Sequence, residues 1–155
     1  MNYLKMTVVA LALMACGGGS STGGLDVEQS YLVSLSPANE VPAPKPTTAS
    51  GTAQVVVFAD RIDYQLAVTS ITAITMAHIH SGAVGVAGPI VVTLYQTTPP
   101  TGAVNGVFAS GSLTAATLPA GVTLASLKTL LLTGNSYINV HTTANPAGEI
   151  RGQLK

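Results

Sequence analysis

The sequence predicts an all-β fold, a Greek-key β-sandwich with one short helix, from three observations. Charged residues make up 8% of the 155 residues and hydrophobic residues 47%, and so low a charged fraction disfavours helices stabilised by Glu–Lys pairs. The chain is rich in Val and Thr, whose β-branched side chains fit the pleated surface of a strand. Short runs of alternating hydrophobic and polar residues recur between turn residues, which is typical of strands with one buried face.

The predicted elements follow one another from residue 31. Candidate strands cover residues 31–35, 51–59, 61–69, 73–80, 90–95, 106–113, 136–142 and 149–154. The proline-rich segment 36–50 predicts a loop, and Asp60 marks a hairpin between the second and third strands. Leucines at helical spacing predict one helix at residues 124–132, which ends before Gly134. The length predicts a single domain, to which we assign residues 31–155.

Residues 1–15 are predicted to be a removable export signal. Lys5 supplies a positive charge, and residues 8–16 form an apolar run of nine residues. Such a run is far shorter than the roughly 20 residues that cross a bilayer, but it suits a signal peptide. The run ends in Leu-Met-Ala-Cys at 13–16, which resembles the bacterial lipobox, where the cysteine is diacylated and becomes the new N-terminus. The alternative is an ordinary secretory signal with an incidental cysteine.

Cys16 is the predicted lipidation site. It is the only cysteine in the chain, so it cannot form an internal disulfide. Two or more acyl chains give stable membrane anchoring. The Gly/Ser/Thr-rich residues that follow are a flexible linker, and we assign residues 16–30 to the lipidated cysteine and its tether. We therefore expect a lipid-anchored protein of the cell envelope. In a Gram-negative cell, Gly17 in place of an aspartate favours the outer membrane, on its periplasmic or its surface face.

Composition and motifs exclude several function classes. The formal net charge is zero, and the chain has no Trp and few other aromatic residues, so neither a basic stripe nor a stacking platform for nucleic acid is present. No glycine-rich phosphate loop, no G-x-S-x-G motif and no obvious catalytic pair of carboxylates occurs. Nucleic-acid binding, nucleotide chemistry, serine-nucleophile chemistry and glycoside hydrolysis are therefore unsupported.

The three histidines of the chain, His78, His80 and His141, all lie in predicted strands. His78 and His80 are two residues apart, so both point to one face of their strand, with Cα atoms about 6.6 Å apart. A third imidazole from another strand could complete a set of ligands for copper, zinc, nickel or iron. The alternative is a structural polar cluster, in which backbone or carboxylate groups satisfy each ring.

Three charged residues are candidates for supporting roles near the histidines. Glu149 and Arg151 share a face of the last predicted strand. They form either a surface ion pair, worth under about 1 kcal/mol, or a functional pair in which Arg151 lies beside the histidines and guides an anion or orients Glu149. Glu40, in the proline-rich loop, could pair with Arg151 or act as an oxygen ligand.

Several segments together resemble the CHRD domain, a repeat first described in chordin and found in many bacterial proteins. They are SPANEVP at 36–42, AHIHSG at 77–82, GPIV at 88–91, YINVHT at 137–142 and PAGEIRGQL at 146–154. The family has no settled enzymatic activity. The resemblance implies a binding module, which we expect to hold copper or zinc through the three histidines. A purely structural or adhesive surface domain is an alternative.

A weaker resemblance is to Cu,Zn superoxide dismutase, also a Greek-key sandwich. In that family a His-x-His strand and a later histidine bind copper, and a downstream arginine guides superoxide. His78, His80, His141 and Arg151 occur in that order, which implies a dismutase-like copper enzyme as a further alternative. The chain lacks the bridging fourth copper histidine, the zinc-loop ligands and the disulfide. Because the chain departs from the dismutase pattern in these ways, two arrangements of the sandwich remain expected, a dismutase-like one and an immunoglobulin-like one.

Overall fold

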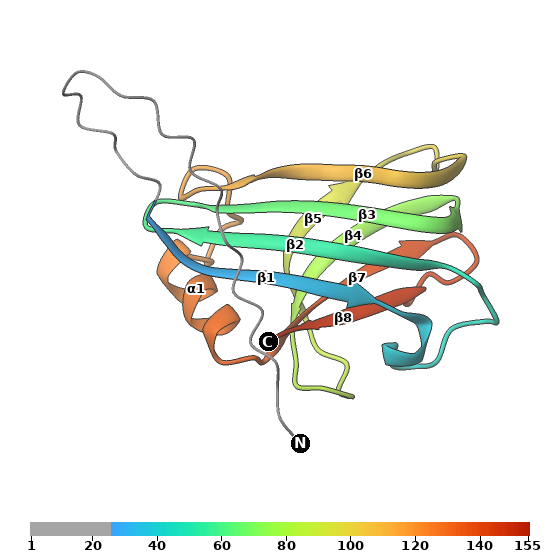
Figure 1. Cartoon of the computed structure of the whole chain (residues 1–155), viewed down its shortest axis with the longest axis horizontal. Coiled ribbons are helices and arrows are strands. Elements are labelled where there is room, and N and C mark those ends of the chain that lie inside the picture. Colours follow the sequence, from blue (N-terminus) through green and yellow to red (C-terminus); the bar gives the residue numbers. More distant parts are fainter. Residues whose placement is uncertain (1–25) are drawn as a thin grey trace, which may run out of the picture.

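A computed structural model describes residues 26–155 and shows an all-β sandwich with one short helix (Figure 1). Its elements are β1 (Val27–Leu35), η1 (Pro37–Asn39), β2 (Ser50–Phe58), β3 (Ile62–Thr72), β4 (Ile74–Ser81), β5 (Ile90–Gln96), β6 (Ala103–Leu113), α1 (Leu124–Leu132), β7 (Ser136–Thr142) and β8 (Ile150–Leu154). One antiparallel sheet has the order β1-β2-β3-β6, and the other has the order β5-β4-β7-β8. The chain changes sheet after β3, β5 and β6, as in Greek-key sandwiches. The predicted fold class is confirmed.

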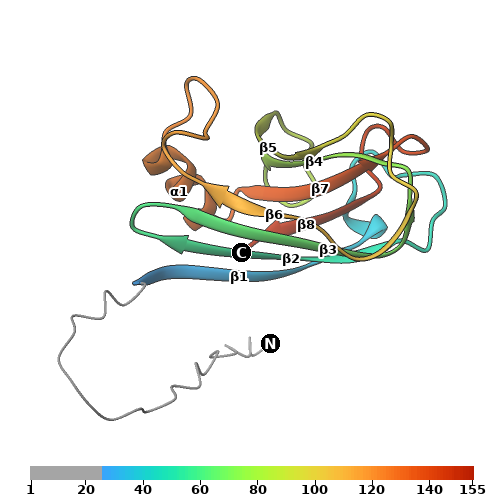
Figure 2. The ribbon, with the colours of Figure 1, turned by 90° about the horizontal axis from the view of Figure 1, so that it is seen from above.

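The hydrophobic core lies between the two sheets, which Figure 2 shows as two layers. Along β3, Ile62, Leu66 and Val68 are buried while Gln65 is exposed, because successive side chains of a strand point to opposite faces. Ile79 on β4 faces them from the second sheet and is completely buried. Each aliphatic side chain of this size contributes roughly 1.5–3 kcal/mol when it is fully buried.

The helix α1 lies at one end of the sandwich (Figure 1). Thr123 caps it by accepting a hydrogen bond from the Ser126 backbone N–H, and the Ser126 hydroxyl accepts one from the Thr123 N–H. This reciprocal capping starts the helix where the leucine pattern predicts it. Leu127 and Leu131 are buried against the core. No helix among residues 26–155 is long and apolar enough to cross a lipid bilayer.

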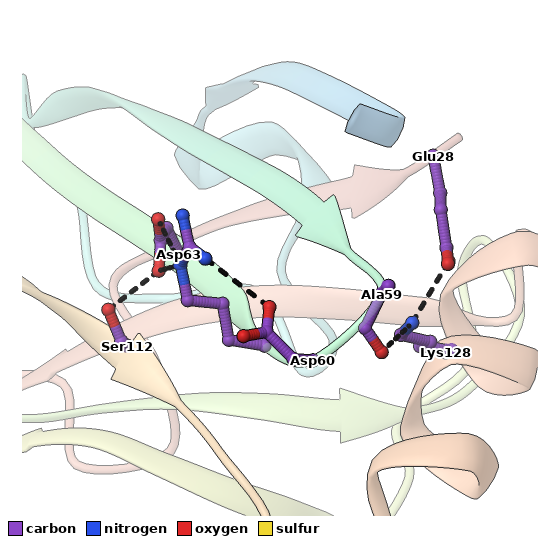
Figure 3. Close-up of polar contacts among 7 residues, drawn as sticks. Glu28, Ala59, Asp60, Asp63, Ser112 and Lys128 are labelled. Atoms are coloured by element: carbon purple, nitrogen blue, oxygen red, sulfur yellow. Dashed lines mark hydrogen bonds and ion pairs between the residues drawn. The ribbon is translucent and has the colours of Figure 1, made fainter. Parts of the chain in front are cut away.

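Exposed ion pairs secure the elements at this end of the molecule (Figure 3). The Lys128 ammonium group of α1 donates to the Glu28 carboxylate of β1 at 3.0 Å and to the Ala59 carbonyl at 2.8 Å. At the hairpin between β2 and β3, Arg61 pairs with Asp63 at 3.1 Å. Such exposed pairs contribute under about 1 kcal/mol each, so the core between the sheets carries the stability of the fold.

The first strand starts earlier than the sequence predicts. It begins at Val27, so residues 27–30, assigned above to the tether, pair with β2, where Val27 is opposite Phe58. The side chains of 27–30 are all exposed, and the pairing uses only their backbone. The sequence of residues 27–30 therefore has no alternation of buried hydrophobic and exposed polar residues that would predict a strand. The predicted signal peptide and Cys16 lie outside the described residues.

Loops cover the outer face of the second sheet around β7, so this part of the face forms a second, polar interior. Strand β7 is buried along its whole length, although only one of its faces meets the core. The loop between β4 and β5 crosses the other face, where the Ala83 and Val86 carbonyls accept hydrogen bonds from Arg151. The loop after β1 joins it from the other side, where the Asn39 side chain donates to the Arg151 carbonyl. The candidate site lies beneath these loops.

Candidate metal centre

The structure brings all three histidines to the outer face of the second sheet. His78 and His80 come from β4 and His141 from β7, which is the hydrogen-bonded neighbour of β4. His141 is directly opposite Met76, and residues opposite each other in an antiparallel pair share a face. His141 is therefore diagonally adjacent to His78. All three side chains are buried.

The imidazole nitrogens converge to within a short distance of one another. The Nδ1 atom of His78 is 3.0 Å from the Nε2 atom of His141, and one ligand atom from each of the three rings lies within 4.8 Å of the others. Two nitrogens that bind one ion at about 2.1 Å are about 4.2 Å apart on opposite sides of the ion and about 3.4 Å apart at the tetrahedral angle, so atoms 4.8 Å apart must approach by about 0.6 to 1.4 Å. Rotamer adjustment of a side chain covers this distance.

Backbone carbonyl groups fix the protonation of two of the rings. His80 Nδ1 is 2.8 Å from the Gly88 carbonyl oxygen, and His141 Nδ1 is 3.0 Å from that of Pro146. A carbonyl oxygen only accepts hydrogen bonds, so each Nδ1 carries a proton and, in the neutral ring, each Nε2 presents a lone pair. The Nε2 atom of His80 is buried and has no hydrogen-bond partner. This is the arrangement in which histidines ligate metals, with the second nitrogen held by an outer partner.

Burial keeps the three rings neutral. It lowers the pKa of His78 to about 4, and the neighbouring His141 and His80 rings lower it further in the same direction. Burial also lowers the pKa of His80 and of His141, although their hydrogen bonds to Gly88 and Pro146 oppose the shift. Neutral imidazole is the form that binds a metal ion, so the site is in its binding form at neutral pH.

Tyr137 and Arg151 support His80 from the side. The Tyr137 ring stacks on the His80 ring, with centroids 4.7 Å apart and planes 7° from parallel. The guanidinium carbon of Arg151 lies 3.3 Å from the centroid of the Tyr137 ring. Because β7 lies between β4 and β8, the Tyr137 ring lies between His80 on β4 and Arg151 on β8. Arg151 is 1% exposed and donates to the carbonyls of Ala83 and Val86. It therefore anchors the covering loop.

Of the two alternatives for Glu149 and Arg151, the surface ion pair does not form. Both residues are buried, and the ion pairs found among residues 26–155 do not include them. The Glu149 carboxylate instead accepts hydrogen bonds from the hydroxyls of Thr47 and Thr142. Glu149 thus ties the loop after β1 to the end of β7. The sequence of the strand left both alternatives open because the loops that cover this face have no signature in the strand itself.

Glu40 lies beneath the loops beside Arg151. Burial raises the pKa of its carboxyl group to about 7, against the opposing effects of the Arg151 charge and the Asn139 side chain. A methyl group added at Gly148 would lie 2.6 Å from the Glu40 Cδ atom, so the carboxyl group packs on the glycine backbone. Neither Glu40 nor Glu149 belongs to the cluster of possible ligand atoms, which within the described chain contains the three histidines.

Asn139 is a member of the site that was not among the residues predicted from the sequence. Its Oδ1 atom is 2.9 Å from the Nε2 atom of His141, and its side chain is buried. The signal was present in the alternation along β7, where Tyr137, Asn139 and His141 alternate with the core residues Ile138 and Val140. An unbroken polar face of this kind, flanked by core residues, indicates a buried polar site on the outer side of the sheet.

The comparisons with known proteins identify the family. The model of the CHRD domain matches residues 31–154, which is nearly all of the part that the structure describes. Neither the search of curated proteins nor that of solved structures found a match. Because the family model covers well over half of the chain, the chain belongs to the CHRD domain family.

Proposed function

We propose that this CHRD domain is a binding module that holds one transition-metal ion, copper or zinc, through His78, His80 and His141. The observation that carries the proposal is the orientation of the rings. Two of them turn a bare Nε2 atom toward the third, because carbonyl groups hold their Nδ1 protons. Three neutral imidazoles are a ligand set that suits both metals.

The unpartnered nitrogen of His80 favours a metal site over a purely structural cluster. A buried acceptor without a partner costs about 1–3 kcal/mol, and His80 Nε2 is such an atom. A bound cation would satisfy the lone pair and so offset this cost.

Arg151 favours metal holding over dismutase chemistry. An arginine that guides an anion must present its charge to solvent. Arg151 instead is 1% exposed, and one of its terminal nitrogens donates to two loop carbonyls. Its place supports a role in holding the loop over the site.

The proposal includes an anchor at the N-terminus. Acyl chains on Cys16 would fix the domain to the cell envelope, and the lipobox-like segment at 13–16 supports this. Labelling of cells with a palmitate analogue, followed by membrane fractionation, tests it. We expect label and membrane association in the wild-type protein and neither in Cys16→Ser. A labelled Cys16→Ser protein would overturn the proposed attachment site.

Calorimetric titration with Cu(II) and with Zn(II) tests the metal site. The full chain carrying Cys16→Ser is used, so that neither lipid nor thiol competes. We expect about one ion per chain, and a loss of at least about 100-fold in affinity in the variant His78→Ala/His80→Ala, since even outer partners of metal ligands affect affinity by about 10–100-fold.

The matched control is Gln54→Ala/Gln65→Ala, which alters two exposed residues that are directly opposite each other on the other sheet. This control should bind like the parent protein. Equal binding by the histidine variant, or no binding by a folded parent protein, would refute the proposal. Circular dichroism of each variant verifies the fold.

A further inference from the structure

Asn139 lies at the centre of the histidine cluster, although the metal proposal does not use it. It precedes His141 by two residues on β7 and is directly opposite His78 on β4. It therefore shares their face of the sheet. Its Oδ1 atom is 2.9 Å from His141 Nε2. The amide oxygen thus lies as close to His141 Nε2 as His78 Nδ1 does, at 3.0 Å.

The contact between Asn139 and His141 shows which end of the amide group faces the imidazoles. The atom that lies 2.9 Å from His141 Nε2 is the amide oxygen, Oδ1. Three imidazole nitrogens and one amide oxygen, each able to offer a lone pair to an ion, therefore lie in one buried cluster.

The separations within this set resemble those of neighbouring and opposite ligands in a tetragonal site. Two ligands at about 2.1 Å from one ion are about 3.0 Å apart at 90°, about 3.4 Å apart at the tetrahedral angle and about 4.2 Å apart on opposite sides of the ion. His141 Nε2 is 3.0 Å from His78 Nδ1 and 2.9 Å from Asn139 Oδ1, which are the distances of neighbouring ligands. The three nitrogens spread over as much as 4.8 Å, which is nearer the opposite-ligand distance than the tetrahedral one. Tetragonal sets of nitrogen and oxygen ligands are typical of Cu(II) and Ni(II), whereas structural zinc sites are tetrahedral.

We infer that Asn139 supplies a fourth ligand through its Oδ1 atom, which completes a tetragonal site of three nitrogens and one oxygen that selects Cu(II) over Zn(II). The inference rests on the proposed metal-holding function and adds to it a ligand and a preferred metal.

Competition titrations and electron paramagnetic resonance of the full chain carrying Cys16→Ser test the inference. We expect an axial Cu(II) spectrum in the parent protein. In Asn139→Ala the affinity for Cu(II) should fall by about 10–100-fold, with a smaller loss for Zn(II) and a changed copper hyperfine coupling. Asn139→Asp, which retains an oxygen donor, should restore most of the affinity. Asn105→Ala, at an exposed position on β6, is the matched control.

A measurement on the parent protein keeps the test valid if Asn139→Ala does not fold. Pulsed resonance of the Cu(II) protein labelled with ¹³C-asparagine should show a hyperfine coupling to an amide carbon. Absence of that coupling, a spectrum typical of a tetrahedral site, or unchanged affinity and selectivity in a folded Asn139→Ala would overturn the inference. Loss of binding in the histidine double variant alone would then leave the three-histidine site standing without the fourth ligand.

Discussion

Replacement of Glu40 by glutamine should stabilise the protein at alkaline pH. Burial beneath the loops raises the pKa of this carboxyl group from 4.5 to about 7. Because the folded state holds the proton more tightly than the unfolded state, the stabilising contribution of the protonated group is complete below about pH 4.5 and is lost as the pH rises through 7. Glutamine is neutral at every pH and avoids this loss.

The size of the effect follows from the pKa shift. A shift from 4.5 to about 7 corresponds to an upper limit of about 3 kcal/mol, since one pKa unit equals about 1.36 kcal/mol. Water near the loops screens part of the charge, so we expect about 1–2 kcal/mol. The Glu40→Gln variant should match the wild-type protein at pH 4, below the unfolded pKa of 4.5, and should exceed its stability by that amount at pH 8.5.

Urea unfolding of the full chain at the two pH values measures the difference. Each variant is compared with the wild-type protein at the same pH, so the titration of the histidines cancels in the comparison. Glu28→Gln is the control, because it removes the same charge from a side chain that is 46% exposed and ion-paired with Lys128. We expect it to change stability by under about 1 kcal/mol at either pH. An equal effect of Glu40→Gln at both pH values would refute the assigned burial of its carboxyl group.

Three further predictions concern packing, the covering loop and the metal. Gly152→Ala should destabilise the fold by about 1–3 kcal/mol in urea unfolding, because the added methyl group would lie 2.6 Å from the Ser34 carbonyl oxygen. An unchanged unfolding midpoint would contradict the close contact of β8 with β1. Arg151→Met should speed protease cleavage within residues 82–89, since two carbonyls of that loop lose their shared donor; an unchanged cleavage rate would show that other contacts hold the loop. Cu(II) at 100 times its dissociation constant should stabilise the protein by about 2.7 kcal/mol in thermal unfolding, and a similar gain in His78→Ala would place the ion elsewhere.

Patterns of hydrophobic residues within single elements explain which parts of the fold the sequence predicts. The alternation in β3 and the leucine spacing of α1 each report burial on one face, which is a property of a single element. The helix and β7 accordingly have the predicted bounds. The spacing of His78 and His80 likewise places both rings on one face, and His141 lies with them because β7 pairs with β4.

Contacts between distant segments explain what the sequence does not predict. Residues 27–30 join a strand only because β2 offers them a partner. Glu149 resembles a solvated residue until the loop after β1 brings Thr47 to it. Tyr137 and Asn139 gain their roles from neighbours on other strands and loops, with Tyr137 between His80 and Arg151. In each case the deciding neighbour is far away along the chain.

The anchoring of the loop between β4 and β5 by Arg151 has a consequence for the order of assembly. His78 and His80 enter the growing chain some seventy residues before Arg151 does, and β8 is the last strand of its sheet in chain order. Until β8 is synthesised, the guanidinium group that fastens the loop over His80 is missing. The histidine pair therefore gains this cover only when the C-terminal strand has been made and has paired with β7.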